Sequence, residues 1–161
     1  MSVKKRNAIR RRMAGVTLVE SLVALVVISV GMLGIAGMYL SSLQASRSAN
    51  MRVQAMNLTT DISDRIRANR RALTNYTVSA TGTGTAHDCA TATCTPKDIA
   101  ENDLYVWKQA ISTTLPANAN GTVVFVDNAA PNPDRYTITV TWREPNSDID
   151  YTNTMNVESE P

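Results

Sequence analysis

The chain has 161 residues, of which 43% are hydrophobic and 5% aromatic, and its formal net charge is +2. Six of its 16 basic residues and none of its 14 acids lie within residues 1–15, so the remainder carries a net charge of −4. This length allows one small folded domain beside a membrane segment, and a mildly acidic main part argues against a nucleic-acid binder.

The N-terminal part joins a basic leader to a long apolar run. The run extends from Val16 to Leu40, and Glu20 is the only charged side chain between Val16 and Ser46. About 20 apolar residues cross a bilayer core as a helix, and flanking basic residues stay on the cytoplasmic side. The sequence therefore predicts one membrane-spanning helix over residues 16–40, with a cytoplasmic leader and an exported remainder. The basic residues of the leader are Lys4, Lys5, Arg6, Arg10, Arg11 and Arg12.

The small residues and the acid of this stretch have unusual positions. A cleavable secretory signal carries its small-residue cut site after the apolar run, whereas Ala14 and Gly15 precede it. A carboxylate such as Glu20 costs about 2.5–3.5 kcal/mol at the centre of a membrane helix. Cleavage between Gly15 and Val16 explains both features, because the new amino group would share a helix face with Glu20, four residues on, and the helix dipole favours an acid there. The alternative is an interfacial Glu20 without a partner.

Three glycines lie in the second half of the apolar run, at steps of three residues. Gly31, Gly34 and Gly37 each cost about 1 kcal/mol of helix propensity relative to alanine. One interpretation is close packing between membrane helices, for which small residues are suited. The other is a weak point in the helix that stretches or unwinds when helices pack in a filament.

After Ser41 the apolar pattern narrows to one stripe with polar residues opposite. No proline or glycine interrupts it, so a single helix is predicted from about Thr17 to about Ala72. The stripe residues are Met51, Ala55, Leu58, Ile62, Ile66 and Leu73. Four basic residues near the end of this helix complement its dipole, and DNA binding is the alternative role for them; they are Arg65, Arg67, Arg70 and Arg71.

A loop rich in threonine, alanine and glycine follows over residues 74–95, with one short strand expected at Tyr76–Ser79. Cys89 and Cys94 lie in this exported part, and such a pair in an oxidising compartment predicts a disulfide. The short loop that it closes limits the stabilisation to about 2 kcal/mol in the chain-entropy model. The alternative is a metal site that uses the same cysteines together with His87 and Asp88.

A second helix and three strands are predicted after the cysteines. Thr95 can cap the helix, Pro96 suits its first position, Asp98 has the capping-box spacing, and Pro116 ends it. The apolar face of this helix comprises Leu104, Trp107, Ile111 and Leu115.

Two strongly β-prone segments, Thr122–Asp127 and Arg135–Arg143, flank a turn-rich linker and predict an antiparallel hairpin. Tyr151–Val157 is a candidate third strand. The alternating apolar residues of the second segment should face the long helix; they are Tyr136, Ile138, Val140 and Trp142. No catalytic constellation emerges from the sequence, so we expect no enzyme, no cofactor and no metal.

The stretch Gly15-Val16-Thr17-Leu18-Val19-Glu20 resembles the class III signal of type IV prepilins, a glycine followed by a hydrophobic residue, Thr, Leu, an aliphatic residue and Glu. The family usually has Phe where this chain has Val16. The resemblance implies that prepilin peptidase cleaves between Gly15 and Val16 and that the Val16 amine is methylated. In a filament core the Val16 amine would pair with a Glu20 carboxylate and fix the axial register, because any other register leaves two charges in an apolar medium.

The same resemblance implies an α+β type IV pilin fold. Residues 1–15 would be the cleaved leader, residues 16–73 a long helix whose first part, 16–40, lies in the membrane or filament core, and residues 74–161 a periplasmic head. That head would hold the disulfide loop, the short helix and a small antiparallel sheet.

Further segments resemble the PilV-type minor pilins of Gram-negative bacteria. The similar segments are residues 20–27, 31–37, 47–48 and 64–69 and, more loosely, Cys89 with Cys94, Asp103-Leu104 with Trp107, and residues 136–142. The resemblance implies a minor pilin that primes type IV pilus assembly at the inner membrane, ends near the pilus tip, and supports twitching motility and adhesion. Its expected partners are the inner membrane, prepilin peptidase, other minor pilins and the major pilin, with a tip adhesin as a further candidate.

Three alternatives to this interpretation stay open. The first is a minor pseudopilin of type II secretion, similar to the GspI family, which shares the Glu-x-Leu-Val-Ala-Leu motif but is generally shorter. The second is an anchored periplasmic protein that enters no filament. The third is a minor pilin that binds DNA for uptake, although we expect no nucleic-acid partner.

Overall fold

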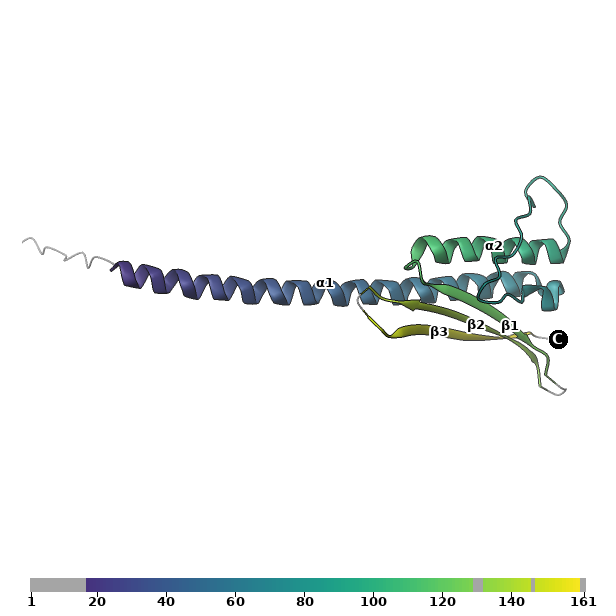
Figure 1. Ribbon diagram of the computed structural model, residues 1–161. Helices are drawn as coiled ribbons and strands as arrows, with labels where there is room; N and C mark the ends of the chain where they lie inside the picture. Colours follow the sequence, from purple (N-terminus) through teal and green to yellow (C-terminus); the bar gives the residue numbers. More distant parts are fainter. Residues whose placement is uncertain (1–16, 129–131, 146, 160–161) are drawn as a thin grey trace, which may run out of the picture. The chain divides into compact units, whose positions relative to one another are not determined.

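The computed structural model describes residues 17–128, 132–145 and 147–159. The chain divides into two compact units, one ending at Gln44 and the other beginning at Ala45. The elements, labelled in Figure 1, are the helices α1 (Leu18–Ala68), η1 (Arg70–Tyr76) and α2 (Pro96–Thr114) and the strands β1 (Asn120–Val126), β2 (Asp134–Arg143) and β3 (Asp150–Ser159).

The described part of the first unit is the N-terminal portion of α1. Its large apolar side chains are exposed on all sides of the helix. The most apolar stretch of 18 residues in α1 has a mean hydropathy of 2.4, and no residue of that stretch is buried. By length and composition, α1 can cross a membrane.

The second unit has two layers, with the remainder of α1 and α2 side by side against one face of a three-stranded sheet (Figure 1). The strand order is β1-β2-β3, and both pairs are antiparallel. The predicted hairpin and third strand are therefore confirmed. The core forms where the apolar stripe of α1 and the apolar face of α2 meet the buried residues of β2, among them Ile138 and Val140.

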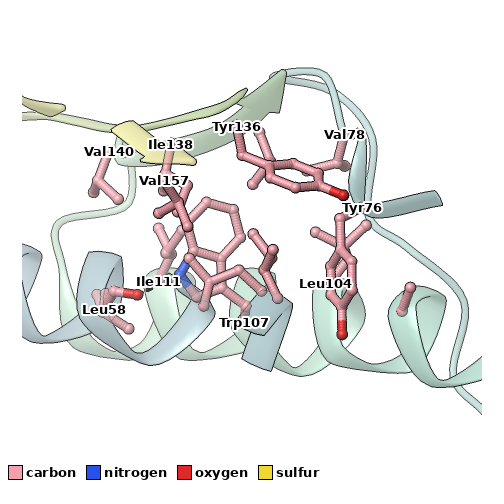
Figure 2. Close-up of a cluster of buried hydrophobic side chains, with 14 of the residues drawn as sticks. Leu58, Tyr76, Val78, Leu104, Trp107, Ile111, Tyr136, Ile138, Val140 and Val157 are labelled. Carbon is pink, nitrogen blue, oxygen red and sulfur yellow. Dashed lines mark hydrogen bonds between the residues drawn. The ribbon is translucent and has the colours of Figure 1, made fainter. Parts of the chain in front are cut away.

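Trp107 lies at the centre of this core and joins the two helices to the sheet (Figure 2). Its ring is fully buried, and its indole Nε1 donates a hydrogen bond of 2.9 Å to the carbonyl oxygen of Leu58 on α1. Gly121 of β1 leaves the space for this ring, since a Cβ there would lie 2.5 Å from both Trp107 and Ile111. The tryptophan is thus a core residue with its polar atom satisfied.

The alternation predicted for the second strand is confirmed. Tyr136, Ile138, Val140 and Trp142 are buried, whereas the residues between them are half-buried. They pack in one cluster with the apolar stripe of α1, as expected. The side chain of Leu73, the last predicted member of that stripe, lies outside the described residues.

The end of the long helix differs from the prediction. α1 ends at Ala68 rather than near Ala72, and the tighter helix η1 follows it. Asn69 interrupts the α-helix with φ −118° and ψ 54°, and its side-chain amide donates to the carbonyl oxygen of Pro96 at 2.8 Å. This contact turns the chain toward α2 at a position that local helix propensity does not reveal.

The strand predicted at Tyr76–Ser79 is also shorter than expected. Tyr76 belongs to η1, and Val78 alone forms an isolated bridge with Val123 of β1. The burial of the Tyr76 ring holds this segment in the helical turn, because the ring fills the core between α1 and α2. One bridge is therefore what remains of the expected strand.

The second helix agrees with its predicted signals. Thr95 caps α2, and its Oγ1 accepts a hydrogen bond of 3.2 Å from the backbone N–H of Asp98, while the Asp98 carboxylate accepts the N–H of Thr95 at 2.9 Å. This reciprocal pair is a capping box with aspartate in place of glutamate. Pro96 occupies the start of the helix, as its fixed φ favours.

Candidate functional site

The N-terminal end of α1 is built around a threonine cap. The backbone N–H of Glu20 donates to Thr17 Oγ1 at 3.3 Å, and the N–H of Ser21 donates to the Thr17 carbonyl oxygen at 3.2 Å. Thr17 thereby satisfies N–H groups that a helix start leaves without partners. Gly15 and Val16 lie outside the described residues, so cleavage and methylation there stay predictions.

Glu20 is the only acid in the first turn of α1, where the helix dipole favours a negative charge. Within the described ranges its carboxylate forms no hydrogen bond and no ion pair, and the apolar side chains beside it are exposed, Leu18 to 86% and Val19 to 68%. A carboxylate surrounded by apolar surface is poorly placed for either lipid or packed protein unless an opposite charge accompanies it. An opposite charge beside Glu20 would remove this cost.

The three glycines of the apolar run are not needed for packing within the chain. Apart from its chain neighbours and the nearby backbone of its own helix, a Cβ added at Gly31, Gly34 or Gly37 would meet no heavy atom of the described residues within 4 Å. Both interpretations of these glycines, close helix packing and local stretching, therefore depend on a neighbouring molecule rather than on this chain.

A buried polar network closes the other end of α1. Asp103 of α2 is 9% exposed, and its two oxygens contact the Arg65 guanidinium at 2.9 Å and the Tyr76 hydroxyl at 2.6 Å. Burial, and then the hydrogen bond to this carboxylate, raise the pKa of Tyr76 well above its usual value. The network ties α1, η1 and α2 together, and we infer that its role is structural.

Arg65 and Arg67 at this end contact carboxylates of the described residues. Arg65 contacts Asp61 at 3.0 Å in addition to Asp103, and Arg67 contacts Asp64 at 3.3 Å. Their charge is partly neutralised within the chain, which weakens the case for DNA binding at this cluster.

The structure joins Cys89 and Cys94 in a disulfide, with a Cα–Cα distance of 5.4 Å. The alternative metal site of His87, Asp88, Cys89 and Cys94 is therefore wrong, because the bridged sulfurs are no longer thiolate ligands. Asp88 instead accepts hydrogen bonds from the backbone N–H of Ala90 and the hydroxyl of Thr91. These bonds, that of Thr91 above all, lower the pKa of its carboxyl.

Two family models match adjacent parts of the chain. The prokaryotic N-terminal methylation motif matches residues 10–36, a range that includes Gly15, Val16 and Glu20, and the family described as Type IV pilin Tt1218 matches residues 37–105. No curated protein and no solved structure matches the chain.

This chain is a type IV pilin or pseudopilin. Its fold is the α+β fold of type IV pilins, a long N-terminal apolar helix with a three-stranded antiparallel sheet packed on it. Type IV pilins are structural proteins, so the match confirms that the chain is not an enzyme.

The methylation motif of this pilin implies processing by prepilin peptidase, and membership of the pilin class implies that other pilins are its partners. Its apolar N-terminal helix agrees with residence in a membrane and then in a pilus.

The polar residues whose contacts could not be predicted from the sequence lie in the head. Asp103 had one signal, since a carboxylate four positions before Trp107 falls on the apolar face of a helix.

Proposed function

We propose that this pilin is a minor pilin of the PilV type, which primes the assembly of type IV pili and is incorporated into them. Glu20, one carboxylate at the start of an exposed apolar helix, is the observation that carries the proposal. The subtype is supported by the resemblance of the segments around Glu20, Arg47 and Asp64 to PilV-type pilins. Twitching motility and adhesion would depend on the protein.

The proposed maturation begins at the membrane. Prepilin peptidase removes residues 1–15 by cutting between Gly15 and Val16, and the new Val16 amine is methylated. The amine then directly precedes the capping residue Thr17, so α1, which starts at Leu18, begins two residues after the new terminus. Residues 16–40 hold the protein in the inner membrane, and residues 74–161 form the periplasmic head behind the long helix of residues 16–73.

The proposed assembly mechanism depends on one charge pair. The apolar helices leave the lipid and pack against one another, and the Val16 ammonium pairs with the Glu20 carboxylate of the same or a neighbouring subunit. Any other axial register would bury two separate charges in apolar surroundings, which costs several kcal/mol for each. The pair therefore selects the register, whereas the apolar side chains supply most of the attraction.

The experiment that tests the proposal measures the mature terminus and the assembled product together. We expect mass analysis of the protein from cells to show a chain that begins at methylated Val16, and Gly15→Ala to leave an uncut and unassembled precursor. Deletion of the gene should reduce surface pili and twitching and leave type II secretion intact. Loss of secretion with normal pili would assign the protein to the pseudopilins instead, and function of the uncut chain would show a simple membrane anchor.

A further inference from the structure

Three metal-ligating side chains meet at the start of α2, outside the assembly segment. They are His87, two residues before the disulfide-bonded Cys89, and Asp98 and Glu101 from the first turns of α2, and their ligand atoms lie within 4.8 Å of one another. We propose that these three residues bind a divalent transition-metal ion, represented by Zn²⁺. This inference does not rest on the function proposed above.

The distances are close to those of a coordination shell. His87 Nε2 lies 2.9 Å from Glu101 Oε2, and both side chains are 29% exposed. Metal–ligand bonds of about 2.0–2.2 Å separate neighbouring ligand atoms by roughly 3.0–3.5 Å. The His87–Glu101 pair therefore already has the spacing of two ligands of one ion, and the ligand atom of Asp98 lies within 4.8 Å of theirs.

Asp98 and Glu101 are placed by the helix itself. They are three residues apart and so lie on one face of α2. A single oxygen of Asp98, Oδ2, accepts hydrogen bonds from the backbone N–H of Thr95 at 2.9 Å and from its hydroxyl at 2.8 Å. The other oxygen forms no hydrogen bond within the described residues, so it is available to a metal.

His87 belongs to a segment that packs directly against α2. Its backbone N–H donates to Asn102 Oδ1 at 3.0 Å, and the N–H of Thr85 donates to the carbonyl oxygen of Glu101 at 3.2 Å. Gly84 allows this close approach, since it has a φ of +71° and a Cβ there would lie 2.6 Å from the backbone of Tyr105. The histidine is therefore held at the site by the fold rather than carried on a free loop.

The donor set indicates the class of metal. Imidazole nitrogen favours Zn²⁺, Ni²⁺ and Cu²⁺, whereas Ca²⁺ and Mg²⁺ prefer shells of oxygen alone. Lys97, which lies 3.6 Å from Glu101 Oε1, is a competing cation, but its side chain is 63% exposed and can turn into solvent. A bound ion would link the segment that precedes the disulfide to α2 and stabilise the head by mass action. Without an ion, the same residues form only a hydrogen-bonded histidine–glutamate pair.

The test uses the full chain in detergent micelles, without a polyhistidine tag, stripped of metal by a chelator and kept oxidised so that no free thiol binds zinc. His87 is the only histidine, so its ring resonances in NMR spectra report on this site directly. We expect Zn²⁺ to bind with 1:1 stoichiometry in calorimetry and to shift the Nε2 resonance of His87. Ca²⁺ should bind at least about tenfold more weakly.

Two variants and a matched control complete the test. His87→Gln and Glu101→Gln should each weaken Zn²⁺ binding at least about tenfold, whereas Glu158→Gln, an exposed glutamate on β3, should not change it. An unshifted His87 ring in wild-type protein at saturating Zn²⁺ would overturn the proposal, even if a variant failed to fold. Equal Zn²⁺ affinity of wild type and His87→Gln, or Ca²⁺ affinity equal to that of Zn²⁺, would overturn it as well.

Discussion

Two carboxylates show how the two regions of this pilin differ. Asp103 in the head is buried and contacts Arg65 and Tyr76, whereas Glu20 at the start of α1 has no ionic or hydrogen-bonding partner within the described part of the chain. The apolar residues differ in the same way, being buried in the head and exposed along the N-terminal part of α1. The head is explained by its own contacts, but the N-terminal part is explained only by contacts with other molecules.

The largest expected effect on stability is in the centre of the head. Trp107→Ala should lower the free energy of unfolding by about 3–5 kcal/mol, because it leaves a cavity and removes the hydrogen bond to Leu58. Chemical denaturation of the full chain in detergent, followed by circular dichroism, measures the loss. Val106→Ala, at the exposed neighbouring position, is the control and should change stability by less than about 0.5 kcal/mol. Equal losses would show that the head is not organised around the tryptophan.

The buried charge network should rank next. Asp103→Asn keeps the shape of the side chain but leaves the Arg65 cation without this partner, and we expect a loss of about 1–3 kcal/mol. The loss stays below that of a fully buried pair because Arg65 is one-third exposed and keeps its contact with Asp61. Asp64→Asn, which breaks the exposed pair with Arg67, should cost about 0.5 kcal/mol or less. A larger loss from Asp64→Asn than from Asp103→Asn would contradict a structural role for the network.

Glycines give a direct contrast between the two regions. Gly121→Ala should destabilise the head by about 1–3 kcal/mol, because the new methyl group would clash with Trp107 and Ile111. Gly34→Ala should leave the denaturation midpoint of the head unchanged, since no described residue outside the adjoining turns of α1 lies within 4 Å of the added atom. If Gly34→Ala lowered that midpoint, the N-terminal part of α1 would have an internal packing role that the structure does not show.

A smaller effect should appear at alkaline pH. The pKa of Tyr76 is raised in the folded chain, so above about pH 10 the unfolded chain releases this proton while the folded chain retains it. The unfolded state is then favoured, and stability should fall as the pH rises through that range. Tyr76→Phe should show a shallower decline between pH 9 and 11, whereas an identical slope would mean that the hydroxyl is not in the buried network.

Some elements of the two regions can be predicted from local sequence patterns, and others cannot. The apolar run, the Thr95 cap and the alternation of β2 are local patterns, so the elements that they specify were predictable. The end of α1 was not, because it depends on a contact between Asn69 and Pro96, far apart in the sequence. Tertiary packing likewise brings Arg65 to Asp103, and His87 to Asp98 and Glu101. Only Asp103 had a local sign in the sequence, because it is an acid within the apolar face of α2.

The central claim is that the Glu20 carboxylate fixes subunit register by pairing with the Val16 amine. Its most direct test is the amount of Glu20→Gln protein in purified pili, relative to the amount in the inner membrane, with Ser21→Ala as the control. We predict normal cleavage and membrane insertion for both variants, and incorporation reduced at least about tenfold for Glu20→Gln alone, because the amine then lacks its counter-charge. Normal incorporation of Glu20→Gln would contradict the claim.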